Sequence, residues 1–130
     1  MKDKGVSKNN FDINLKAVSD KRIGIVKSSW NSLITDRLYE GSINTLIENG
    51  IKKEDIRTLV VPGSFELIYG AKKLYTQYKA DAIIVVGSVI QGETPHFNFI
   101  CQSIANGIKD LNILFDIPFI FCVSTDLNIN

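Results

Sequence analysis

Four short, almost continuously apolar runs constrain the fold of this 130-residue chain more than any other feature. They occupy residues 22–26, 56–61, 82–86 and 118–123, and the third can continue to residue 90. Runs of this length that are rich in Val and Ile are typical of strands buried on both faces, and such strands belong to parallel sheets. The sequence therefore predicts a four-stranded parallel sheet.

Segments with helical periodicity separate these runs. In residues 31–49 apolar side chains recur at helical intervals, and Gly50 follows as a C-terminal stop. Residues 67–78 repeat the pattern, and residues 97–111 carry the clearest apolar stripe, which ends near Asp116. Strands that alternate with helices predict an α/β fold with helices on both faces of the sheet. Three helices leave part of one face bare, which implies a partner subunit or a C-terminal segment that this sequence lacks.

Composition argues against several classes of function. The chain is 45% hydrophobic and 22% charged with a formal net charge of +1, so nothing in its charge points to nucleic acid or an anionic membrane. No run approaches the roughly 18 consecutive apolar residues that cross a bilayer. The N-terminus lacks the apolar core of a secretory signal, so the expected location is the cytoplasm. We expect residues 1–21 to form a flexible, solvated arm rather than a basic binding tail, and residues 22–130 to form a single domain.

Thiol and metal-ligating side chains are sparse. Cys101 and Cys122 lie within apolar runs and are predicted to be small core residues rather than disulfide partners or metal ligands. His96 is the only histidine, and no cluster of cysteine or acidic residues accompanies it. The sequence therefore predicts no metal site.

Three polar segments follow the first three predicted strands: KSSWNS (27–32), VPGSFE (61–66) and GSVIQGETPH (87–96). Because the carboxyl ends of parallel strands share one edge of the sheet, where ligands collect, a site is expected to draw on all three segments. Gly87 and Gly92 are spaced almost as in a phosphate-binding Walker loop. Glu93, however, stands where that loop needs a lysine, which argues against an NTP-hydrolysing site.

The third segment also contains a predicted helix start. Thr94 is a good N-cap and Pro95 suits the first helical position, so His96 falls in the first turn. Free backbone amides at a helix N-terminus favour an anion such as phosphate, so a phosphate site and a candidate base would lie within one turn of each other. The alternative is a surface histidine beside a cap that binds nothing, and the residues alone do not decide between the two.

The other two segments add candidates. Pro62 and Gly63 end the second strand and allow a ligand to approach the backbone closely. Glu66 either supplies negative charge to the start of the next helix or accepts hydrogen bonds from sugar or polyol hydroxyls. Trp30, the only tryptophan, either packs in the core or stacks on a planar heterocycle. Together the segments predict a site for a small molecule that is aromatic, hydroxylated and phosphorylated, without naming a reaction.

The pair VPGSFEL (61–67) and GSVIQGETPHF (87–97) resembles the signature of the 6,7-dimethyl-8-ribityllumazine synthase family, and the likeness runs over residues 22–126. The resemblance implies a flavodoxin-like three-layer α/β/α fold and assembly as homopentamers or sixty-subunit shells, with sites between adjacent subunits. It also implies a transferase of riboflavin biosynthesis. Such an enzyme condenses 5-amino-6-(D-ribitylamino)uracil with 3,4-dihydroxy-2-butanone 4-phosphate without a metal or an organic cofactor.

Motif position then implies a role for each candidate residue. His96 matches the proton-transfer histidine of the family, and Trp30 falls where an aromatic residue, commonly phenylalanine, stacks on the pyrimidinedione. The other implied substrate-binding residues are Ser64, Phe65 and Glu66 at the pyrimidine and ribityl site, Ser88, Val89 and Ile90 at the pyrimidine edge, Glu93 and Thr94 at the butanone phosphate, and Phe121 from a neighbouring subunit.

The resemblance further implies helices after the fourth strand that bring a phosphate-binding arginine. The sequence printed here ends at Asn130, and no residue maps to that arginine. A helix terminus with Thr94 holds phosphate less firmly than a bidentate guanidinium does. The alternatives are a truncated chain, a reduced enzyme with weak phosphate binding, or a non-catalytic lumazine-synthase-like protein of binding or shell assembly. A generic flavodoxin-like mononucleotide module is a further alternative.

Overall fold

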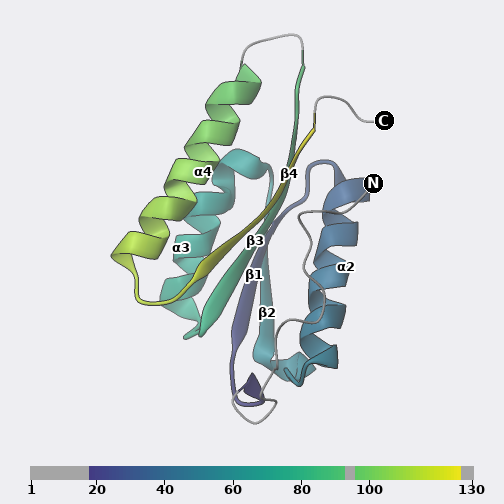
Figure 1. Cartoon of the computed structure of the whole chain (residues 1–130), viewed down its shortest axis with the longest axis vertical. Helices are drawn as coiled ribbons and strands as arrows, with labels where there is room; N and C mark the ends of the chain where they lie inside the picture. The colour runs from purple at the N-terminus through teal and green to yellow at the C-terminus, as the bar shows by residue number, and fades with distance from the viewer. Residues whose placement is uncertain (1–17, 93–95, 127–130) are drawn as a thin grey trace, which may run out of the picture.

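A parallel four-stranded sheet forms the centre of the chain in the computed structural model, which describes residues 18–92 and 96–126 (Figure 1). Its strand order is β2-β1-β3-β4. All pairs are parallel, which confirms the predicted sheet. Within the described ranges, no helix is both long and apolar enough to cross a membrane. The strands are β1 (Ile23–Ser28), β2 (Ile56–Val61), β3 (Ala82–Ile90) and β4 (Phe119–Asp126).

Helices cover the sheet in the three-layer α/β/α arrangement that the resemblance implied. Helix α2 (Ser32–Glu48) lies on one face, and α3 (Leu67–Gln77) and α4 (His96–Leu114) lie side by side on the other (Figure 1). Short 3₁₀ turns, η1 (Lys53–Asp55) and η2 (Ser64–Glu66), lead into β2 and α3. These elements match the predicted α/β order.

Two strands are longer than their apolar runs predicted. The first continues to Ser28 and the fourth to Asp126. Sheet pairing uses backbone groups, and Lys27 pairs in register with Val60 on one side and Val86 on the other. A polar side chain can therefore belong to a central strand, which an apolar pattern alone does not reveal.

Apolar side chains pack on both faces of the sheet. On the α3 and α4 face, the fully buried residues include Val26, Val85 and Leu67. On the α2 face, Ile25 and Val86 are fully buried beneath the helix. Burying an aliphatic side chain of this size contributes about 1.5–3 kcal/mol, so these two layers fix the sheet on which the site is built.

The structure bears on two predictions: that the N-terminal segment is a flexible arm, and that part of one sheet face is bare. Of the predicted N-terminal arm, residues 18–21 are described, and Val18 packs against the cluster beneath α2. At the opposite edge of the sheet, Ile120 and Phe121 of β4 are 47% and 45% exposed. Helix α2 packs on β1 and β3, so this part of β4 remains partly uncovered. Residues 1–17 of the arm lie outside the described residues.

Candidate functional site

The polar segments after β1, β2 and β3 meet at a pocket of about 410 Å³ at the carboxyl edge of the sheet. Trp30 lines it from the loop after β1, residues 63–66 from the turn after β2, and residues 88–90 from the end of β3. His96 and Ile100 complete the wall from α4. The structure thus brings together most of the residues that the sequence singled out, as the topology of a parallel sheet requires.

A larger hollow, of about 610 Å³, lies at the opposite edge, where β1 and β3 begin. Its exposed surface is mostly apolar, and its polar lining residues are Lys21, Thr45, Asn49, Asp81 and Asp116. We place the site in the smaller pocket because a binding site is recognised by polar groups that converge on an apolar recess, and the smaller pocket has the histidine, the glutamate and the tryptophan.

Ser64 joins the turn after β2 to the end of β3. Its Oγ donates a hydrogen bond of 2.8 Å to the carbonyl of Ser88, and both residues are buried. Gly87 permits this close approach, because a Cβ there would lie 2.6 Å from Leu67 Cδ1 and 3.1 Å from Ser64 Oγ. Two walls of the pocket are therefore held together by a buried hydrogen bond.

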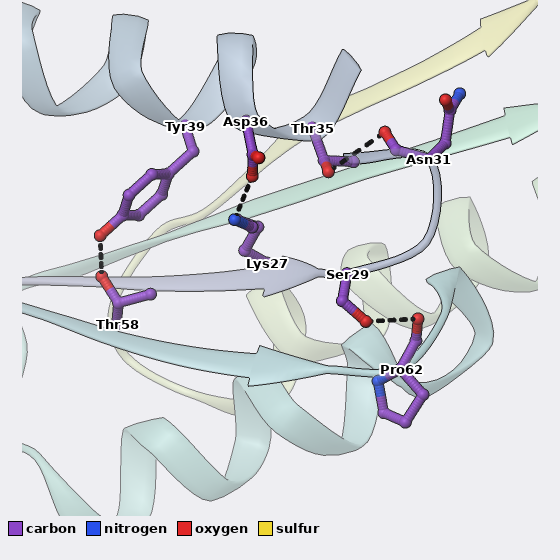
Figure 2. A network of polar contacts seen from close by, with 8 residues as sticks. All are labelled: Lys27, Ser29, Asn31, Thr35, Asp36, Tyr39, Thr58 and Pro62. Atoms are coloured by element: carbon purple, nitrogen blue, oxygen red, sulfur yellow. Dashed lines mark hydrogen bonds and ion pairs between the residues drawn. The ribbon is translucent and has the colours of Figure 1, made fainter. Parts of the chain in front are cut away.

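Trp30 lies in a loop that is joined to the end of β2. The amide of Ser29 donates to the carbonyl of Val61 at 2.8 Å, and that of Trp30 donates to the carbonyl of Pro62 at 3.1 Å. Ser29 Oγ also donates to the carbonyl of Pro62, at 3.2 Å (Figure 2). The Trp30 side chain is 51% exposed, so it forms a wall of the pocket rather than part of the core.

Glu66 is engaged at the start of α3. Its Oε1 accepts a hydrogen bond of 2.8 Å from the amide of Gly63, which is one half of a capping box, because Gly63 has no side chain to return a bond. The side chain is exposed at the pocket. A carboxylate has about four lone-pair sites, so this bond leaves capacity for ligand hydroxyls. The structural role of Glu66 is thus shown, and its ligand role stays a prediction.

His96 begins α4 and is exposed where it lines the pocket. The predicted cap at Thr94 and Pro95 and the predicted phosphate residue Glu93 lie outside the described residues. His96 is therefore placed beside Trp30 and Glu66 around one recess, while the predicted anion site next to it stays a prediction.

Phe121 does not join this pocket. It borders a different hollow, of about 520 Å³, between β4 and α2, with Leu38 and Ile120 among its neighbours. The strand register explains the separation, because Phe121 pairs with Val85, well before the end of β3 at Ile90. Within one chain, the aromatic side chain predicted to close the site lies away from it.

Asn31 is a residue of the site region that sequence reasoning missed. Its side-chain Nδ2 donates to Ser88 Oγ at 3.0 Å, and its backbone has the left-handed conformation, with φ 58° and ψ 56°. The available signal was an asparagine at the first position of a predicted helical segment, since asparagine tolerates this conformation better than most residues.

The two cysteines lie outside the pocket lining. Burial raises the pKa of the Cys101 and Cys122 thiols, and a hydrogen bond with Ser42 lowers that of Cys122 in part. Both side chains are half-buried and free, and each packs against an apolar cluster. Among the residues that the structure describes, no three His, Cys, Asp or Glu side chains are grouped closely enough to hold a metal ion.

Comparison with known proteins places this chain in a family. The sequence model of 6,7-dimethyl-8-ribityllumazine synthase matches residues 20–130. A protein of that name from Christiangramia forsetii is 51% identical over 131 aligned residues, which cover 99% of this chain and 78% of the relative. Another, from Flavobacterium johnsoniae, is 55% identical over 109 residues, covering 84% of this chain and 57% of the relative.

A third relative, from Parabacteroides distasonis, carries the same name and is 47% identical over 116 residues, which cover 88% of this chain and 72% of the relative. The chain thus spans between 57% and 78% of the length of these three relatives. The family match and the pocket at the carboxyl edge of the sheet lead to one conclusion: the chain belongs to the 6,7-dimethyl-8-ribityllumazine synthase family, a family of transferases of riboflavin biosynthesis.

Proposed function

We propose that this chain condenses 5-amino-6-(D-ribitylamino)uracil with 3,4-dihydroxy-2-butanone 4-phosphate to form 6,7-dimethyl-8-ribityllumazine. The observation that carries the proposal is the convergence of Trp30, Glu66 and His96 on one pocket from three separate segments of a chain of this family. An aromatic face, a carboxylate and an imidazole suit a planar heterocycle, a polyol and a proton transfer, in that order.

Each wall of the pocket has a proposed task. Trp30 stacks on the pyrimidinedione, and Glu66 accepts hydrogen bonds from ribityl hydroxyls with the lone pairs that Gly63 leaves free. The end of β3, at residues 88–90, holds the pyrimidine edge. Glu93 and Thr94, by motif position, bind the phosphate of the butanone. No cofactor is required for this condensation.

Two kinds of catalysis account for the proposed rate. The substrate amine and the ketone form an imine with loss of water; phosphate then leaves, and the second amine closes the ring with loss of a second water. Holding both substrates in attacking geometry can supply an effective molarity of about 10⁵ M or more. His96 takes the proton from the attacking nitrogen and returns one to the leaving hydroxyl, which adds a factor on the order of 10² to 10⁴.

We further propose that the chain works in the cytoplasm as a homopentamer or a larger shell, in which Phe121 of one subunit closes the pocket of its neighbour. Phe121 is 45% exposed and borders a hollow away from its own pocket. Phe65, Tyr69 and Phe99 are each more than half exposed, which favours burial against other subunits.

The proposed reaction is tested by mixing the purified chain with both substrates and recording the absorbance and fluorescence of the lumazine product. We expect product to form faster than in the same mixture without protein. The His96→Ala variant serves as the matched control for catalysis by the pocket. Product formation at the uncatalysed rate would contradict the proposal and favour a protein that binds these compounds without converting them.

A further inference from the structure

The loop that carries Trp30 is tied to the strands on both sides of β1. Toward β2, the amide of Trp30 donates to the carbonyl of Pro62 at 3.1 Å. Toward β3, Asn31 Nδ2 donates to Ser88 Oγ at 3.0 Å. Because β1 lies between β2 and β3 in the sheet, these two bonds hold the loop to segments on both sides of β1, with Trp30 at the wall of the pocket.

The backbone of Asn31 is fixed by the helix that follows it. Its left-handed conformation turns the chain into α2, and its carbonyl accepts hydrogen bonds from the amides of Ile34 and Thr35 at 3.0 and 3.1 Å. Thr35 Oγ1 adds a third, at 3.3 Å (Figure 2). In the same view, the side-chain amide of Asn31 points away from Thr35. Asn31 therefore connects the start of α2 to the end of β3.

The anchor that Asn31 reaches is buried, whereas the Trp30 ring beside it is only partly covered by protein. Ser88 is 1% exposed, and its carbonyl accepts the hydrogen bond from Ser64 Oγ. Trp30 is 51% exposed, so half of its side chain has no protein neighbour to fix it. The position of the ring relative to residues 88–90 therefore depends on the loop, and the bond between Asn31 and Ser88 is the link that ties the loop to β3, while the bonds of Ser29 and Trp30 tie it to the end of β2.

We propose that Asn31 is a positioning residue that sets the spacing between the Trp30 ring and the end of β3, and thereby the affinity for the planar substrate. This inference rests on the proposed function, because it assigns substrate orientation to the same pocket. It gives Asn31 a role distinct from helix capping, since Asn31 makes no side-chain hydrogen bond to α2. A group that acts before the chemical step changes KM more than kcat.

The first test uses Trp30 as its own reporter, because it is the only tryptophan of the chain. Asn31→Gly keeps the left-handed conformation accessible and removes the amide. We expect its Trp30 emission to shift to longer wavelength and its acrylamide quenching to increase. Asn49→Ala is the matched control, because Asn49 lies at the other end of α2 and its amide bonds only within that helix region, to the carbonyl of Thr45. We expect the control to match the wild type.

The second test separates binding from turnover. For Asn31→Gly we expect the KM for 5-amino-6-(D-ribitylamino)uracil to rise about three- to tenfold, which is the effect expected from the loss of one ordinary hydrogen bond. We expect kcat, and the KM for the butanone phosphate, to change less than about twofold. Ser88→Ala should give a similar rise, and the double variant should fall short of the product of the two single effects, because the two residues share one bond.

Unchanged Trp30 fluorescence together with an unchanged KM in Asn31→Gly would overturn the inference, as would multiplicative effects in the double variant. Equal effects of Asn31→Gly and Asn49→Ala would overturn it too, because they would indicate a general loosening of α2. If Asn31→Gly fails to fold, Ser88→Ala decides by the Trp30 fluorescence readout alone, because Ser88 itself lines the pocket and can change KM directly. If the wild type converts no substrate, the proposed function fails, and the fluorescence comparison still judges whether Asn31 positions the ring.

Discussion

His96 lines the pocket as an exposed residue at the first position of α4, where it can reach a bound substrate without being part of the core. For His96→Ala we expect kcat to fall by about 10² to 10⁴ while the KM of each substrate changes less than about threefold, because the lost group acts on protons rather than on ground-state binding. Steady-state kinetics measure both. Gln102→Ala, an exposed position further along α4, is the control. If the KM values rose by as much as kcat fell, the role of His96 in proton transfer would be contradicted.

Glu66 has a structural bond and a proposed ligand role that two substitutions can separate. Glu66→Gln keeps an oxygen that can accept from the Gly63 amide, whereas Glu66→Ala removes it. We expect both to raise the KM for the ribityl substrate, by about fivefold for Gln because a charged acceptor is stronger by roughly 1 kcal/mol. We expect only Glu66→Ala to lose stability, about 0.5–2 kcal/mol in urea unfolding. An unchanged KM for the ribityl substrate in Glu66→Gln would contradict the proposed ligand role of Glu66.

At the scale of elements, α2 is docked on the sheet by polar contacts as well as by apolar packing. Lys27 of β1 forms an ion pair with Asp36, and its Nζ lies 5.1 Å from the centroid of the Tyr39 ring. The hydroxyls of Tyr39 and Thr58 are 2.7 Å apart (Figure 2). These contacts join β1 and β2 to the helix whose first turn begins beside Trp30. They therefore contribute both to the stability of the fold and to the geometry of the site.

The two partners of the ion pair are unequally buried, so we expect their substitutions to lower the free energy of unfolding by different amounts. The Lys27 side chain is 17% exposed and that of Asp36 is 50% exposed. Asp36→Asn leaves a nearly buried ammonium without its counter-charge, which costs about 1–3 kcal/mol. Lys27→Met leaves a carboxylate that water can reach, so the loss should be smaller. Urea unfolding measures both, and the opposite order would show that the pair is effectively solvated.

For the whole molecule, the placement of Phe121 away from its own pocket predicts complementation between defective subunits. His96→Ala and Phe121→Asp should each be nearly inactive alone. When the two are co-expressed and form mixed rings, about a quarter of the sites should combine an intact His96 with an intact Phe121 from the neighbour, because the proposed ring would close through head-to-tail interfaces. Activity is measured together with native mass.

The native mass must first show that the assemblies contain both variants. If the activity of such a mixture does not exceed the summed activities of the two variants, a site shared between subunits is contradicted. A monomeric wild type would contradict the proposed assembly directly. Co-expression of His96→Ala with itself in a tagged form is the control for mixing.

Much of the fold followed from local pattern. The apolar run at 56–61 predicted β2 with its observed bounds, and the stripe over 97–111 predicted most of α4. The run did not predict the burial of β2, because β2 lies at the edge of the sheet and only Val61 is buried. The location of the site could also be predicted from the sequence. Parallel strands end at one edge of the sheet, and the segments that follow β1, β2 and β3 are polar. The extension of β1 through Lys27 was missed, because backbone pairing does not require an apolar side chain.

The sequence by itself determined the α/β class, the order of elements, the family and the residues that carry the proposed chemistry. The tertiary structure alone decided which side chains meet: Asn31 with Ser88 across 57 positions, Lys27 with Asp36 beneath Tyr39, and Phe121 in a hollow apart from the pocket. The physical reason is that periodicity reports how each element is buried against its surroundings. The partner of a given polar atom depends on loop turns and on the packing of segments distant in the chain, which no local pattern contains.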